Sequence, residues 1–137
     1  MGTFTEEITL DNVGDIINVR NGRISDANIR TVTLDALPDT GAWTPAINEE
    51  VRQKLGLAVV EMVESGIADG STAEYGLTEP VEIRWKDRRI SQEEVVVPNA
   101  SEILMGALPP ESMDLYVDPV NQRLIGVHRD QQIRRLK

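Results

Sequence analysis

The sequence has no cysteine and a single histidine, His128, among its 137 residues. The absence of cysteine excludes disulfides, thiolate nucleophiles, iron–sulfur clusters and cysteine-based zinc sites. One histidine excludes a histidine-rich metal site within one chain, and a serine–histidine triad would depend on that residue alone. We therefore expect any catalytic chemistry to use carboxylates, with no metal and no other cofactor.

Long hydrophobic runs are also lacking, since no stretch comes close to the roughly 18 apolar residues that a membrane-spanning helix needs. Residues 1–10 are polar and acidic, whereas a secretory signal has a basic stretch followed by an apolar one. The sequence therefore predicts a cytoplasmic protein with no membrane partner. Its hydrophobic content of 40% and charged content of 27% are typical of a globular domain.

Positive charge is scarce, because 14 Lys and Arg against 23 Asp and Glu give a net charge of −9. Binding to nucleic acid needs a basic surface that contacts phosphates, so we expect no nucleic-acid partner. The last nine residues, 129–137, carry a charge of +3, which leaves −12 on residues 1–128. The sequence predicts a single domain over residues 1–128, followed by a basic and solvated tail over 129–137.

Short alternating segments separated by Gly, Pro, Asn and Asp predict an all-β domain. We expect strands over residues 3–10, 31–36, 57–64, 81–85 and 94–97, with a last hairpin between 116–117 and 123–127. Asn21-Gly22 predicts a further hairpin turn, because this dipeptide favours the left-handed backbone that such turns require. Residues 94–97 are expected to pair with 81–85, beyond a turn at 86–89.

One or two short helices complete the expected domain. Asn48 is placed to cap a helix on which Val51 and Leu55 share a face, and Gly56 is placed to end it. A second short helix is expected to start at Pro109, because proline is tolerated in the first turn of a helix.

The expected strand over residues 31–36 leads directly into Pro-Asp-Thr-Gly-Ala at 38–42. A catalytic carboxylate must be held rigidly, and a glycine after a strand lets the backbone bend so that the side chain faces a cleft. Asp39 is therefore the candidate catalytic residue, and its active-site turn consists of Thr40, Gly41 and Ala42. In the alternative interpretation Asp39 lies in an ordinary Asx turn and Trp43 lies in the core.

This segment resembles the active-site signature of the retroviral-type (retropepsin-like) aspartic proteases, including uncharacterised bacterial single-domain members. In that family an apolar strand precedes Asp-Thr-Gly-Ala, and two apolar residues and a glycine follow later, ahead of a short helix. Residues 103–106, Ile-Leu-Met-Gly, match this second mark. The resemblance implies a retropepsin-like half barrel. It also implies a second loop of Leu104, Met105 and Gly106, and a hairpin flap that covers the substrate through Ala68, Asp69 and Gly70.

The resemblance further implies an aspartic endopeptidase that needs two carboxylates, whereas the chain has one Asp-Thr-Gly. Two chains would meet as a homodimer, with Asp39 of each near the two-fold axis. Two carboxylates about 3 Å apart cannot both ionise, so the pair shares one proton. One carboxylate would activate a water that attacks the peptide carbonyl, and the other would protonate the carbonyl oxygen. The expected substrate is an extended peptide or protein.

Two residues differ from the family pattern. Pro38 replaces an aliphatic residue that has a backbone donor, and Trp43 replaces a small polar or acidic residue and becomes a candidate to line the cleft. These differences give an alternative function, a catalytically inactive retropepsin-like module that binds peptide or takes part in assembly. A β-rich structural protein is a third alternative. Asp11 and Asp15 lack the spacing of an EF-hand loop, so we assign no cation site to them.

Overall fold

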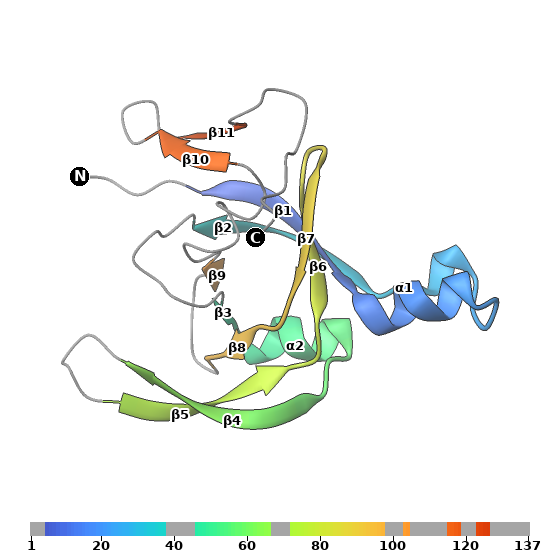
Figure 1. Ribbon diagram of the computed structural model, residues 1–137, viewed down its shortest axis with the longest axis horizontal. Helices are drawn as coiled ribbons and strands as arrows, with labels where there is room; N and C mark the ends of the chain where they lie inside the picture. The colour runs from blue at the N-terminus through green and yellow to red at the C-terminus, as the bar shows by residue number, and fades with distance from the viewer. Residues whose placement is uncertain are drawn as a thin grey trace, which may run out of the picture.

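The computed structural model describes residues 5–37, 46–66, 72–97, 103–104, 115–118 and 123–126. Its elements in chain order are β1 (Glu6–Asn12), α1 (Val13–Arg20), the 3-10 helix η1 (Asp26–Asn28), β2 (Thr31–Leu37), β3 (Ala46–Ile47), α2 (Glu49–Leu55), β4 (Val59–Gly66), β5 (Thr72–Thr78), β6 (Val81–Trp85), β7 (Arg88–Gln92), β8 (Val95–Val96), β9 (Ile103–Leu104), β10 (Leu115–Asp118) and β11 (Arg123–Gly126) (Figure 1). Strands dominate the described residues, which confirms the predicted all-β class.

Nine of these strands form one open sheet in the order β4-β5-β8-β3-β9-β2-β1-β6-β7, and β10 pairs with β11 in a separate hairpin. Strands that follow each other in the chain pair antiparallel in β1–β2, β4–β5 and β6–β7. Two pairs at the centre of the sheet, β2–β9 and β3–β8, are parallel. The finer prediction of a retropepsin-like half barrel stays a prediction.

Buried and exposed side chains alternate along the strands, so that one face of the sheet packs in the core. On β6, Val81, Ile83 and Trp85 are buried, whereas Glu82 and Arg84 between them face outward. Burying one large apolar side chain contributes about 1.5–3 kcal/mol, so this face accounts for much of the driving force for folding. The core cluster also contains Ile8, Leu10, Ala36, Ile47, Val51, Leu55, Leu57 and Val96.

The helix α2 forms where the sequence predicts it. The Asn48 side chain accepts a hydrogen bond of 2.9 Å from the backbone N–H of Val51, which caps the first turn. Val51 and Leu55 are buried against the sheet. Gly56 ends the helix with φ at +64°, a left-handed conformation that favours glycine.

The hairpin turn expected at residues 21–22 is wrong, because residues 13–20 form the helix α1. The Asn12 side chain accepts a hydrogen bond of 3.0 Å from the backbone N–H of Asp15 and starts this helix. Gly22, with φ at +72°, lies just after the end of the helix. A glycine in the left-handed region serves a helix C-terminus as well as a hairpin turn, so the dipeptide alone did not decide between them.

The expected partner of β6 is also wrong. β6 pairs with β7 through a tight turn at Lys86-Asp87, in which Trp85 opposes Arg88. Residues 95–96 form β8 instead, which pairs with β5 and β3. Four charged residues in a row at 86–89 suggest a solvent-exposed turn, but the Arg88 side chain is only 1% exposed and belongs to a strand.

Two further expectations are confirmed at the level of strands. β10 and β11 form the predicted last hairpin, with Leu115 opposite Gly126. The first strand lies at residues 6–12, somewhat later than expected.

The helix expected from Pro109, the histidine His128 and the tail 129–137 lie outside the described residues. Neither α1 nor α2, the two α-helices of the described part, has the length and apolar character of a membrane span.

Candidate functional site

The centre of the sheet is built from two short strand pairings of β9. β9 lies between β2 and β3, parallel to the first and antiparallel to the second. β2 and β3 are consecutive strands of the chain, and residues 38–45 connect them. The chain therefore leaves the sheet on one side of β9 and returns to it on the other side.

Leu104 is the point at which these pairings meet. Leu37, the last residue of β2, is the register partner of Leu104 on one side. Ala46, the first residue of β3, is its register partner on the other side. Adjacent strands lie about 4.8 Å apart, so the two ends of the 38–45 segment are anchored roughly 10 Å from each other, on both sides of one residue.

Buried residues of the core flank these strand ends. Ala36, next to the end of β2, and Ile47, in β3, are both 0% exposed, and Ala46 is 7% exposed. The buried helix residues Val51 and Leu55 belong to the same apolar cluster. Close packing therefore fixes the two strand ends, at Ala36 in β2 and at Ala46 and Ile47 in β3, between which β9 lies.

The hairpin β4–β5 lies at the sequence position of the expected flap, whose role as a flap stays a prediction. Its register runs from Val59 opposite Thr78 to Gly66 opposite Thr72, so residues 67–71 form its connection, as predicted. The hairpin joins the sheet through β8, which is separated from β9 by β3 alone. In Figure 1, β2 and β4 both run toward the same side of the molecule, at the left of the view.

Most of the predicted site residues lie outside the described residues. This applies to the catalytic candidate and its surroundings, to the flap tip and to two residues of the second loop: Asp39, Thr40, Gly41, Ala42, Trp43, Ala68, Asp69, Gly70, Met105 and Gly106. Of the predicted set, Leu104 is described through its backbone pairing. The structure brings together the strand ends that precede Asp39 and Met105, which are 66 positions apart in the sequence.

A buried carboxyl group that the sequence interpretation missed lies nearby. Glu94 precedes β8 and is 2% exposed, and its Oε2 atom has no hydrogen-bond partner among the described residues. Its backbone N–H donates to the Thr78 hydroxyl at 3.2 Å, and its carbonyl accepts from the Thr78 N–H at 2.9 Å. Burial raises the pKa of the Glu94 carboxyl well above its usual value. Burial therefore disfavours the ionised form of the Glu94 carboxyl in the folded protein.

The acidic residues Asp11 and Asp15 take part in ion pairs. Asp15 accepts two hydrogen bonds of 2.9 Å from the Arg30 guanidinium and one of 2.9 Å from its backbone N–H. These bonds lower the pKa of the Asp15 carboxyl. Asp11 lies 2.8 Å from Arg84. Within the described part of the chain, no three His, Cys, Asp or Glu side chains are grouped as a metal site would need.

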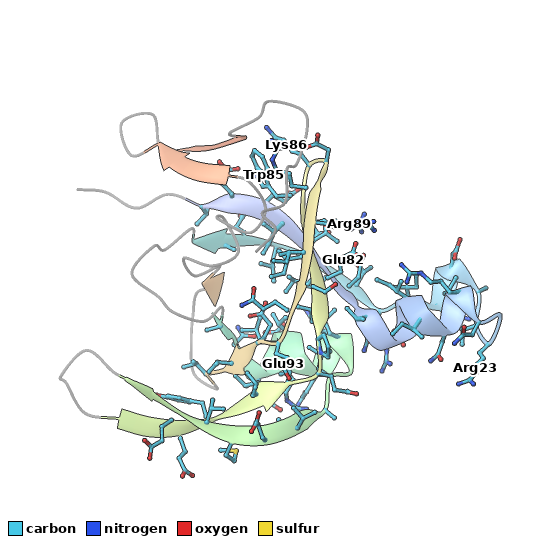
Figure 2. All side chains as sticks on the ribbon, viewed as in Figure 1. Arg23, Glu82, Trp85, Lys86, Arg89 and Glu93 are labelled. Atoms are coloured by element: carbon cyan, nitrogen blue, oxygen red, sulfur yellow. The ribbon has the colours of Figure 1, made fainter. Side chains whose placement is uncertain are left out.

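A second cluster lies on the outward face of β6 and β7. Figure 2 shows Glu82 and Arg89 on this face, and Trp85 and Lys86 at the turn of the hairpin. The sequence pattern contains a signal for it, because charged residues alternate with apolar ones on β6. The strand that brings Arg89 opposite Arg84 was placed wrongly from the sequence, so the cluster was missed.

Comparison with known proteins adds no identification. No protein-family model matches the sequence, and no curated protein matches it significantly. The retropepsin-like resemblance of residues 38–42 and 103–106 stays a prediction.

Proposed function

We propose that the chain is an aspartic endopeptidase that works as a homodimer, with Asp39 of each chain supplying one carboxylate of the catalytic pair. One observation carries the proposal. The strand that leads into the Asp-Thr-Gly segment and the strand that leads into Met105-Gly106 are parallel neighbours, with Leu37 opposite Leu104. The resemblance links two segments that are far apart in the sequence, and the strands before them are neighbours in the sheet.

The parallel direction of the pair matters for the chemistry. The carboxyl ends of parallel neighbours lie at the same edge of a sheet, so the chain continues from Leu37 and from Leu104 at one common edge. In the proposal, Asp39 and the glycine-containing segment after Leu104 meet at this edge, and the paired strands before them supply a rigid base. This is the arrangement that an acid and base acting on a peptide bond requires.

In the proposed mechanism the two Asp39 carboxyl groups share one proton. The ionised member removes a proton from a water, which attacks the carbonyl carbon of the scissile peptide bond. The protonated member donates its proton to the carbonyl oxygen, which gives a gem-diol. The C–N bond then breaks as the carboxyl that took the water proton gives it to the leaving amine, and the other carboxylate takes a proton from a gem-diol hydroxyl, which restores the shared proton. One carboxylate cannot hold both roles at once, so activity depends on dimerisation.

The first experiment tests Asp39 itself. We expect the wild-type protein to cleave peptides from a mixed library at mildly acidic to neutral pH, and Asp39→Asn to reduce the rate by about 10²–10⁴-fold. Asp35→Asn is the matched control, because Asp35 is an exposed acid on β2, the strand that precedes Asp39 in the sequence. Cleavage by Asp39→Asn at the wild-type rate would remove Asp39 from the mechanism.

The second experiment tests the shared pair. Wild-type and Asp39→Asn chains are refolded together at equal amounts, and random pairing leaves roughly one quarter of the dimers with two Asp39 residues. The activity per wild-type chain is then expected to fall to about half, and to about a tenth at a ninefold excess of the variant. An activity per wild-type chain that stays constant would show that one subunit suffices.

The edge strand β4 favours the alternative of a peptide-binding module without turnover. Val59, Val60 and Met62 on this strand are exposed by 45%, 53% and 58%. An edge strand with apolar side chains suits an extended peptide that adds to the sheet through backbone hydrogen bonds. Peptide binding without cleavage, with equal affinity in wild type and Asp39→Asn, would favour this alternative over the protease.

A further inference from the structure

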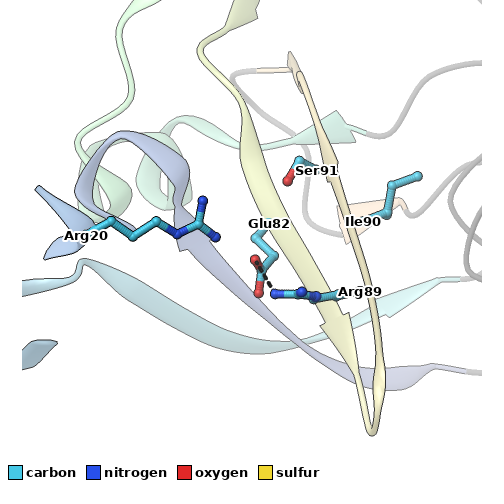
Figure 3. Close-up of a pocket in the computed structure, with 5 residues that line it drawn as sticks. All are labelled: Arg20, Glu82, Arg89, Ile90 and Ser91. Atoms are coloured by element: carbon cyan, nitrogen blue, oxygen red, sulfur yellow. Dashed lines mark ion pairs between the residues drawn. The ribbon is translucent and has the colours of Figure 1, made fainter. Parts of the chain in front are cut away.

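The outward face of the β6–β7 hairpin contains a polar pocket of about 240 Å³ that the proposed protease site does not use. Arg20, at the end of α1, and Arg89, on β7, line it together with Glu82, Ile90 and Ser91. Figure 3 shows the Arg20 and Arg89 side chains reaching toward Glu82 from two different elements. Glu82 and Ser91 are register partners, so both side chains belong to the same face of the sheet.

Three arginines and two acids of the described residues lie on this face: Arg20, Arg84, Arg89, Asp11 and Glu82. Arg84 lies 2.8 Å from Asp11 and 3.5 Å from Glu82, and Arg89 lies 3.8 Å from Glu82. These pairings account for both acids. Among the described residues, no acid lies within ion-pair distance of Arg20. Such an excess is unusual on the surface of a chain with a net charge of −9.

The contact between Arg89 and Glu82 is a long one. Its 3.8 Å exceeds the length of a hydrogen bond, and the Arg89 side chain is 60% exposed. Exposed ion pairs contribute little, so this contact contributes little to the position of the Arg89 guanidinium. The Glu82 carboxylate, which is 13% exposed and also faces Arg84, opposes the entry of an anion.

We propose that this pocket binds the phosphate group of a small phosphorylated molecule. Two guanidinium groups and the Ser91 hydroxyl surround it from α1 and from β7. A carboxylate has two oxygens and is satisfied by one guanidinium fork, whereas a phosphate group has three terminal oxygens and matches donors on several elements. The pocket is larger than a bare phosphate group, so it has room for part of the molecule that carries it.

The test is a titration of the full-length protein, labelled with ¹⁵N, with inorganic phosphate and separately with acetate at constant ionic strength. We expect saturable shifts of the Arg20 and Ser91 amide signals with phosphate, and at least fivefold weaker binding of acetate. Arg20→Gln is expected to weaken phosphate binding at least fivefold. Arg23→Gln, which removes an exposed arginine just beyond α1, is the matched control and should leave binding unchanged.

A variant that is expected to strengthen phosphate binding, Glu82→Gln, completes the test. Glu82→Gln removes the charge that opposes the anion, so it is expected to strengthen phosphate binding several-fold. A merely structural role of the cluster would predict no gain. Shifts that do not saturate, equal binding of acetate, or equal losses in Arg20→Gln and Arg23→Gln would each overturn the proposal. A fold that unravels in Glu82→Gln would be seen in its amide spectrum, and Arg20→Gln then decides alone.

Discussion

Replacing Glu94 with glutamine is expected to remove a pH dependence of stability that the buried carboxyl creates. Glu94 is 2% exposed, and its Oε2 atom has no partner among the described residues, so the charged form is strongly disfavoured in the folded protein. Burial therefore raises the pKa of this carboxyl well above its usual value. In the unfolded chain a glutamate ionises near its ordinary pKa of about 4.3.

The number of protons bound in the folded and unfolded states decides whether the free energy of unfolding rises or falls with pH. Above about pH 4.3 the unfolded state has released the Glu94 proton, whereas the folded state still holds it until the pH reaches the raised pKa. The free energy of unfolding therefore decreases as the pH rises through this window. One proton gives a slope of at most about 1.4 kcal/mol per pH unit. Glutamine cannot ionise, so Glu94→Gln should lose this slope.

Urea denaturation at several values between about pH 5 and pH 8 measures the slope in both proteins at one protein concentration. Histidine side chains also titrate in this window, so both proteins are compared again with His128→Asn. The difference in slope, and not the absolute stability of the glutamine variant, is the measured quantity. Equal slopes in wild type and Glu94→Gln would refute the reasoning.

Two further predictions concern Arg30 and its neighbours. Gly56→Ala is expected to lower the free energy of unfolding by about 1–2 kcal/mol, because Gly56 has φ at +64° and an added Cβ would overlap the Arg30 guanidinium. Gly22→Ala, with φ at +72° and open space around it, is the control and should cost less in urea denaturation. Asp15→Asn should cost about 2 kcal/mol near neutral pH, because it removes the charge that accepts two Arg30 bonds. Arg30 lowers the pKa of Asp15, so this cost should shrink as the pH falls below about 4, which acid titration of the two proteins checks.

The elements that could be predicted from sequence are those fixed by local interactions. The α2 helix has a side-chain cap at Asn48, a buried face and a glycine stop at Gly56, all within nine residues. The β4–β5 hairpin has its connection where the glycines of residues 66–70 place it. Each of these signals acts over a few residues, so a reading of the sequence alone recovers it.

The errors concern choices between distant partners. Residues 95–96 pair with β5 and β3, and nothing within that short apolar segment distinguishes these partners from β6. Asn12 also has a distant partner, because its side chain donates a 2.8 Å hydrogen bond to the Leu55 carbonyl while it accepts from the Asp15 N–H at the start of α1. A tertiary partner selects between two local structures that the sequence permits equally, and this selection is not written in either segment.

The candidate site combines both kinds of information. The Asp-Thr-Gly segment and the later apolar pair with its glycine are local patterns, and both were found in the sequence. Their proximity depends on a two-residue strand, β9, that is too short to fix its own register. That register is set by what flanks β9, because Ala36 and Ile47 are buried in the common core on its two sides. Substitutions that enlarge Ala36 should therefore displace the strand ends on which the Asp39 segment depends, although they leave the segment itself unchanged.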